Sequence, residues 1–141
     1  MSLLSNGNRQ LVRDALAQMT GPVSLVFFTQ TIGCEGCLAA RRVLDEVVPL
    51  NEQLAFEEHN LVLDKETAAT YGVDRAPAIA VVGARDYGIR FYGAPTGYEF
   101  MTLVDAILLA STGDSGLSAE SRELLGGLTA PLDLQVFVTP T

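Results

Sequence analysis

The sequence contains no tryptophan, a single histidine and only two cysteines in 141 residues. Two cysteines are too few for a zinc site with four cysteine or histidine ligands, and no motif implies another metal, a flavin or a nucleotide. No apolar run approaches the roughly 18 residues of a membrane-spanning helix, and the first 20 residues lack the layout of a signal peptide. We therefore expect a cytoplasmic protein without a membrane span and without a bound cofactor.

Positive charge is also scarce, because nine lysines and arginines stand against 17 acidic residues and give a net charge of -8. Nucleic acids and anionic membranes both attract basic surfaces, so this balance argues against either partner. The length suits one domain, and 48% hydrophobic residues are enough for a packed core.

The two cysteines form the motif Cys34-Glu35-Gly36-Cys37, between an apolar run at residues 23–28 and a helical pattern at 38–48. This spacing predicts both sulfurs on one face of a helical turn, with the first among the free N–H groups of the helix N-terminus. The positive end of the helix stabilises the thiolate, which is the form that attacks a disulfide. The motif therefore predicts a catalytic redox pair, Cys34 and Cys37.

The two residues inside the motif have predicted supporting roles. The negative charge of Glu35 next to Cys34 disfavours the thiolate and so opposes the effect of the helix. Gly36 either loosens the first turn of the helix or lets a partner backbone approach, and the sequence does not separate these two roles.

Apolar periodicity predicts the order helix, β, α, β, short α, β, β, α. The first helix has Asn8 as its N-cap, and Phe27 and Phe28 in the first strand point to opposite layers. The later predicted elements are a helix at 38–48, strands at 54–61, 78–82 and 89–92, a short helix at 64–71, and a helix from a capping box at Thr96 and Glu99 to Gly113.

The end of the chain repeats its beginning, because residues 136–141 can be aligned with residues 26–31. Duplication and chance similarity between two short apolar strands both explain this, and we favour duplication. We therefore expect residues 1–113 to form the domain, 114–130 a linker helix and 131–141 the first strand of a truncated second unit. Because a lone strand exposes unpaired edges, we expect it to join the sheet or to pair with a second copy in a homodimer.

This order of elements, with C-x-x-C after the first strand and Ala76-Pro77 before the third, resembles the thioredoxin/glutaredoxin fold. Residues 71–77 and 88–100 make the likeness closer. The chain is similar to the N-terminal half of the glutaredoxin-like protein disulfide oxidoreductases, which consist of two tandem thioredoxin units. The resemblance implies a three-layer α/β/α fold with a mixed four-stranded central sheet and an extra N-terminal helix.

The resemblance also implies a role for each site residue. Cys34 would be the nucleophile, Cys37 the resolving thiol, and Pro77 a cis-proline facing the motif, with Ala76 offering its backbone to a peptide substrate. The implied activity is thiol–disulfide exchange with protein substrates in cell redox homeostasis, with an upstream reductase such as a thioredoxin-reductase-like flavoprotein as a partner. The chain departs from thioredoxin in having Phe28 in place of its buried acid.

Two alternatives remain open. The chain could be a docking or scaffold module of a larger redox protein with an idle cysteine pair, or it could assemble iron–sulfur clusters with glutathione, as some glutaredoxins do. Other polar residues have simpler interpretations: Arg41 and Arg42 fit an ion-paired helix face, and His59 fits a strand surface.

Overall fold

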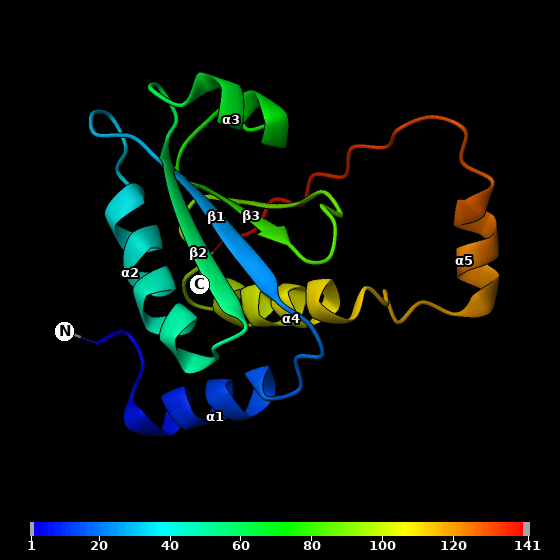
Figure 1. Ribbon diagram of the computed structural model, residues 1–141, viewed down its shortest axis with the longest axis horizontal. Coiled ribbons are helices and arrows are strands. Elements are labelled where there is room, and N and C mark those ends of the chain that lie inside the picture. Colours follow the sequence, from blue (N-terminus) through cyan, green and yellow to red (C-terminus); the bar gives the residue numbers. More distant parts are fainter. Residues whose placement is uncertain (1, 140–141) are drawn as a thin grey trace.

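The computed structural model describes residues 2–139, which fold around one mixed β-sheet (Figure 1). In chain order the elements are α1 (Asn6–Leu16), β1 (Val23–Thr29), α2 (Cys37–Val47), the 3-10 turn η1 (Val48–Leu50), β2 (Leu54–Asn60), α3 (Lys65–Tyr71), β3 (Ala78–Val82), β4 (Ile89–Tyr92), α4 (Glu99–Thr112) and α5 (Ala119–Gly126). The order predicted from periodicity is confirmed as far as α4.

The sheet has the strand order β2-β1-β3-β4, so β1 has a neighbour on both sides. It is parallel to β2 and antiparallel to β3, and β3 is antiparallel to β4. Phe28, near the end of β1, is paired with Ala78, the first residue of β3. The loop that leaves β1 and the loop that enters β3 therefore lie at the same edge of the sheet, and these loops carry the cysteines and Pro77.

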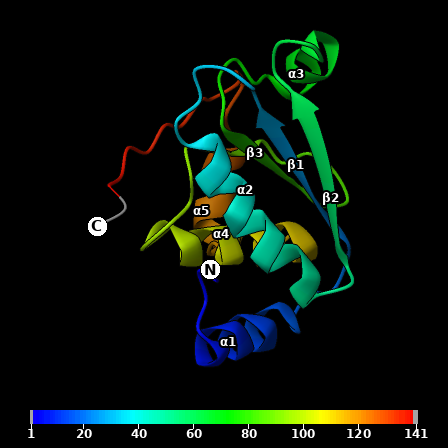
Figure 2. The same ribbon diagram turned by 90° about the vertical axis from the view of Figure 1, so that its left-hand side faces the viewer.

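The two faces of the sheet have different covers, as Figures 1 and 2 show. Phe27 belongs to the larger core, which includes buried residues of α1, α2 and α4. Phe28 belongs to a smaller cluster with Ala68 of α3. The prediction that these two rings point to opposite layers is confirmed, and so is the α/β/α layering with a mixed four-stranded sheet.

The N-caps predicted for α1 and α4 are both wrong. Ser5, and not Asn8, caps α1, and its hydroxyl accepts a hydrogen bond of 3.2 Å from the Asn8 N–H. The capping box does not form, because the Glu99 N–H donates to the backbone carbonyl of Thr96. The helix α4 consequently starts at Glu99, without a side-chain cap.

The strand predicted at residues 131–141 is not formed in its described part, residues 131–139. The sheet of the described residues contains four strands, and this segment is not one of them. The preceding helix α5 has no buried residue and stands apart from the rest of the fold in Figure 1. Residues 140 and 141, which end the predicted strand segment, lie outside the described residues.

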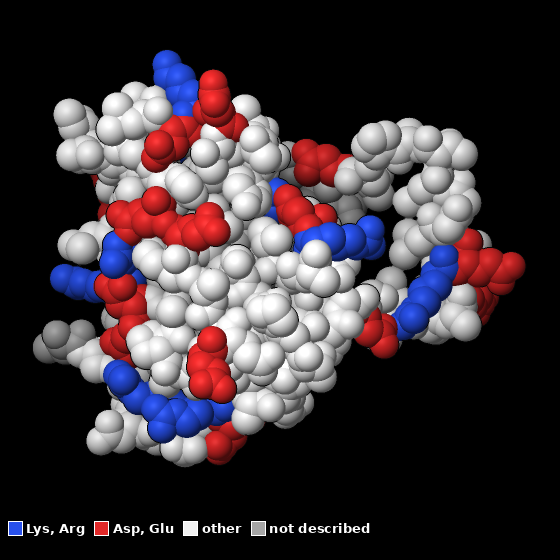
Figure 3. Space-filling view, viewed as in Figure 1, with Lys and Arg blue, Asp and Glu red and all other residues white. Residues whose placement is uncertain are grey.

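Charged groups occur in small separate patches on the face shown in Figure 3, with uncharged surface between them. Arg41 donates a hydrogen bond of 2.8 Å to Asp45 and also contacts Glu58. The predicted ion-paired face of α2 is therefore confirmed for Arg41.

Within residues 2–139, no helix has both the length and the apolarity needed to cross a bilayer.

Arg90 of β4 is hydrogen-bonded to Tyr71, the last residue of α3. The loop that carries Pro77 follows α3 in the sequence. Its guanidinium donates to both carboxylate oxygens of Asp86, at 2.9 and 2.6 Å, and its Nε donates to the Tyr71 carbonyl at 3.0 Å. The two hydrogen bonds from Arg90 to Asp86 hold the pKa of Asp86 below its ordinary value. The ion pair therefore stabilises the fold while Asp86 is ionised, and this contribution is lost as the pH falls through its lowered pKa.

We expect Asp86→Asn to lower the free energy of unfolding at pH 7 by about 1 kcal/mol, because Arg90 loses its ionised partner and the pair is partly exposed. The difference from wild type should be smaller at about pH 2 than at pH 7, because Asp86 takes up a proton as the pH falls through its lowered pKa. Urea unfolding at both pH values measures it. Asp105→Asn, at an exposed site on α4, controls for the change in net charge. A difference that is the same at both pH values would contradict the ion-pair explanation.

Candidate active site

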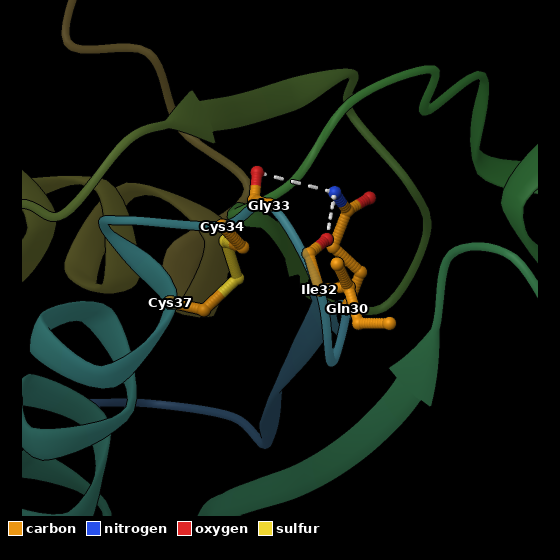
Figure 4. The surroundings of a disulfide bond; sticks show 5 residues. All are labelled: Gln30, Ile32, Gly33, Cys34 and Cys37. Atoms are coloured by element: carbon orange, nitrogen blue, oxygen red, sulfur yellow. Dashed lines mark hydrogen bonds between the residues drawn. A yellow bond between two sulfur atoms is a disulfide. The ribbon is translucent and has the colours of Figure 1, made fainter.

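The cysteine pair lies where the chain passes from β1 into α2. The helix begins at Cys37, and Gly36 is its N-cap. Cys34 therefore lies before the helix, whereas the spacing predicted both sulfurs on one face of a helical turn. The two Cα atoms are 5.5 Å apart, and the sulfurs are joined in a disulfide (Figure 4). The predicted proximity of the sulfurs is confirmed.

The two cysteines differ in their access to solvent. Cys37 has only 7% of its surface exposed and packs at the start of the apolar face of α2. Cys34 is partly exposed, in a loop whose preceding three residues are all exposed. A substrate disulfide can therefore approach Cys34, while α2 and its neighbours shield Cys37.

Pro77 faces the motif. The Ala76–Pro77 peptide bond is cis, as the family resemblance implies. A Cβ atom placed on Gly36 would lie 3.2 Å from Pro77 Cγ, so the two loops are in close contact. Gly36 has an ordinary helical backbone conformation, with φ of -88°. Its lack of a side chain therefore leaves room for the Pro77 ring, and the two roles predicted for Gly36 stay predictions.

The backbone around Pro77 is held on one side and open on the other. The Pro77 carbonyl accepts a hydrogen bond of 3.0 Å from the Gly93 N–H, which continues the pairing of β3 with β4. Ala76 is partly exposed, and no hydrogen bond within residues 2–139 uses its N–H or its carbonyl. Its predicted role in binding a peptide backbone remains a prediction, and the geometry leaves both groups available for it.

The smaller core cluster, to which Phe28 belongs, consists of apolar buried residues. The Phe28 ring is fully buried, 5.7 Å from the His59 ring and 5.9 Å from the Tyr71 ring. No polar or charged residue is buried in the described part of the chain.

Glu35 is exposed and makes no hydrogen bond or ion pair among the described residues. Any influence of Glu35 on Cys34 therefore acts through its charge alone.

Gln30 is a site residue that the sequence did not single out. Its side-chain amide donates to the carbonyl of Ile32 at 2.9 Å and points toward that of Gly33 at 3.4 Å, as Figure 4 shows. A primary amide directly after a buried strand and four residues before Cys34 was the available signal, but nothing in the sequence identifies its acceptors.

The site has no feature of a metal centre or of an enclosed pocket. No group of three or more potential metal ligands occurs among the described residues. Two surface hollows, of about 290 and 620 Å³, are lined by residues other than the cysteines. Cys34 is partly exposed and follows the exposed residues 31–33, where a large substrate can reach it.

Comparison with known proteins agrees with this geometry. No family model matches the sequence. A protein named as a probable thioredoxin, from Methanothermobacter thermautotrophicus, is 31% identical over 84 residues, which cover 59% of this chain and 93% of that protein.

Among solved structures, a protein disulfide oxidoreductase from Aeropyrum pernix has a TM-score of 0.79 at 27% identity, over 88% of this chain and 55% of that one. The alkylhydroperoxide reductase protein AhpF from Enterococcus faecalis also has a TM-score of 0.79, at 24% identity, over 89% of this chain and 61% of that one. The second likeness concerns the fold alone. This chain spans a little more than half the length of either structure.

The chain thus covers nearly all of a thioredoxin relative and carries a joined C-x-x-C pair opposite a cis-proline. It belongs to the thioredoxin family and is a thiol–disulfide oxidoreductase.

Proposed function

We propose that the chain exchanges disulfides with protein substrates, with Cys34 as the attacking thiol and Cys37 as the resolving thiol. The observation that carries this assignment is the difference in exposure, because Cys34 is partly open to solvent and Cys37 is 7% exposed. A protein disulfide can reach only an accessible sulfur, whereas the resolving thiol needs to reach only Cys34.

In the reducing direction, the Cys34 thiolate attacks one sulfur of the substrate disulfide. A bond forms between Cys34 and that sulfur, and the other substrate sulfur leaves as a thiolate and takes up a proton. The Cys37 thiolate, formed by loss of its proton, then attacks the Cys34 sulfur and releases the second substrate thiol. The substrate gains two electrons and two protons, and the chain is left with the Cys34–Cys37 disulfide.

We propose that the substrate segment lies along Ala76 and Pro77. Support comes from the unused N–H and carbonyl of Ala76 and from the contact of Pro77 with Gly36. An extended peptide can add main-chain hydrogen bonds to such unused backbone groups without a demand for one side chain. The open surface around the pair suits a protein better than a small disulfide.

The oxidised pair needs an electron donor before it can act as a reductant again. We propose an upstream reductase as this partner, in particular a thioredoxin-reductase-like flavoprotein, and a role in redox homeostasis in the cytoplasm. The likeness to a protein disulfide oxidoreductase, at 27% identity, supports a place in such a chain of electron transfer. An idle docking module is not favoured, because the pair is joined and Cys34 reaches the surface.

Replacement of either cysteine tests the assignment. We expect Cys34→Ser to lower the rate of insulin reduction with dithiothreitol by roughly 100-fold or more, to the uncatalysed rate, because a serine hydroxyl is a poor nucleophile. Cys37→Ser should instead accumulate a mixed disulfide with the substrate, visible by mass spectrometry, because no resolving thiol remains. A Cys34→Ser variant as fast as wild type would refute the proposal, and adducts on Cys37 of that variant would reverse the two roles.

The charge of Glu35 gives a second prediction. We expect Glu35→Gln to react with iodoacetamide at pH 7 about twice as fast as the reduced wild type, because removing a nearby negative charge favours the Cys34 thiolate. Glu66→Gln, an exposed change in the first turn of α3, is the control and should leave the rate unchanged. Equal rates in all three proteins would show that the charge of Glu35 does not reach the sulfur.

We also propose that residues 1–113 form the thioredoxin-like domain, 114–130 a linker with one helix, and 131–141 the start of a second unit. The support is that α5 buries no residue and that apolar side chains beyond it are exposed. The large exposed apolar residues between positions 132 and 138 are Leu132, Leu134, Val136, Phe137 and Val138. Such a group is costly in water and is normally covered by a further domain or a partner chain.

Truncation tests this division. A chain that ends at Gly113 should unfold within about 2 °C of the full chain, because none of the residues 114–139 is buried and exposed side chains contribute little stability. Light scattering of the two forms tests the homodimer through the C-terminal segment. A full chain that is a dimer and a truncated chain that is a monomer support the homodimer. The same number of chains per particle in both forms contradicts it. A large fall in the melting temperature would place residues 114–141 inside the first domain.

A further inference from the structure

The loop between β1 and the cysteine pair has little structure of its own. Residues 31–33 are all exposed and belong to no helix or strand. Gly33 has a φ of +72°, a conformation that is accessible to glycine at little cost. Because glycine also samples many other conformations, the loop backbone alone does not hold Cys34 in one place.

Gln30 restrains this loop from a fixed base. The residue before it, Thr29, ends β1, and the Thr29 carbonyl accepts a hydrogen bond of 2.8 Å from the Leu61 N–H. From this base Gln30 Nε2 donates to the Ile32 carbonyl at 2.9 Å, and the Gly33 carbonyl lies 3.4 Å from the same nitrogen (Figure 4). One amide nitrogen has two N–H groups and can serve both acceptors, although the second distance is long.

No other donor within residues 2–139 reaches either carbonyl. Each peptide unit is planar, so fixing its oxygen restricts the orientation of the whole unit. The peptide unit of Gly33 includes the Cα atom of Cys34. The amide of Gln30 therefore restrains the backbone position from which the Cys34 side chain extends.

The partner sulfur is held independently, because Cys37 is the first residue of α2 and is buried there. Closure of the Cys34–Cys37 disulfide requires the two sulfurs to meet, and a restrained Cys34 raises the effective concentration of one sulfur at the other. The restraint by Gln30 occurs in the joined form of the pair. It therefore favours the closed disulfide over a form in which the loop is free.

We propose that Gln30 is a positioning residue for disulfide exchange, which holds residues 31–33 so that Cys34 closes onto Cys37. The proposal rests on the redox function of the pair proposed above. Gln30 forms no bond to sulfur and transfers no electron or proton, and its effect on the reaction passes entirely through the position of Cys34.

Replacement by methionine, which has a similar shape and no N–H donor, tests the role. We expect Gln30→Met to lower the equilibrium constant for forming the Cys34–Cys37 disulfide from oxidised glutathione by about threefold to tenfold, the loss expected for one hydrogen bond. The measurement is the ratio of dithiol to disulfide protein after an acid quench, read by mass spectrometry across a series of glutathione ratios. Its melting temperature should stay within about 2 °C of wild type, because the bond is exposed.

Gln53→Met is the matched control. Gln53 Nε2 also donates to a backbone carbonyl, that of Met19, at 3.4 Å, but next to the opposite end of β1. Its glutathione equilibrium should equal that of the wild type. An unchanged equilibrium in Gln30→Met, or an equal fall in both variants, would overturn the positioning role. If Gln30→Met does not fold, Gln30→Ala removes the same donor without adding an apolar surface and is judged by the same outcomes.

Insulin reduction by the same proteins separates this inference from the proposed function. A wild type no faster than Cys34→Ser overturns the function, and with it the functional meaning of Gln30. An active wild type whose glutathione equilibrium is unaffected by Gln30→Met overturns only the positioning role.

Discussion

The antiparallel pairing of β1 with β3 is the constraint on which the site depends. It aligns Phe28 with Ala78, so the chain leaves β1 at the edge where it enters β3. Two loops distant in sequence thereby meet, and the missing side chain of Gly36 leaves room for the Pro77 ring. The hydrogen bond from Gly93 to Pro77 extends the same sheet to its next strand. The cysteine motif and the proline are thus positioned by backbone pairing, and not by polar side chains in the core.

That pairing requires β1 to be buried on both faces, which explains its composition. Phe27 and Phe28 pack on opposite sides of the sheet, and both are almost fully buried. A polar side chain at either position would need a partner, because an unpaired polar group in such a layer costs on the order of 1–3 kcal/mol. The apolar strand fixes the register, and the register fixes the site. The lack of a buried acid at Phe28 is consistent with this demand for burial.

Patterns with a local physical cause could be predicted from the sequence. Apolar periodicity located β1, α2 and the strands that follow, and the spacing of Cys34 and Cys37 predicted their contact, because burial and spacing determine both. Features that depend on competing hydrogen bonds could not be predicted. Ser5 takes the cap assigned to Asn8, the Thr96 carbonyl replaces its hydroxyl, and the acceptors of Gln30 exist only once the loop has folded back. The expected strand after α5 failed for a related reason, since a strand requires a partner that local sequence does not supply.

The same arrangement explains how the pair can open and close without disturbing the fold. No hydrogen bond within the described residues involves either sulfur, whereas the bonds made by Gln30, Gly93 and Leu61 all end on backbone groups. Breaking the disulfide therefore breaks neither of the backbone hydrogen bonds made by Gly93 and Leu61. A bridge between residues only three apart also closes a short loop, and such a bridge restricts the unfolded chain less than a long one does. The pair thus contributes little as a structural staple, and the strand pairing that positions Pro77 does not depend on it.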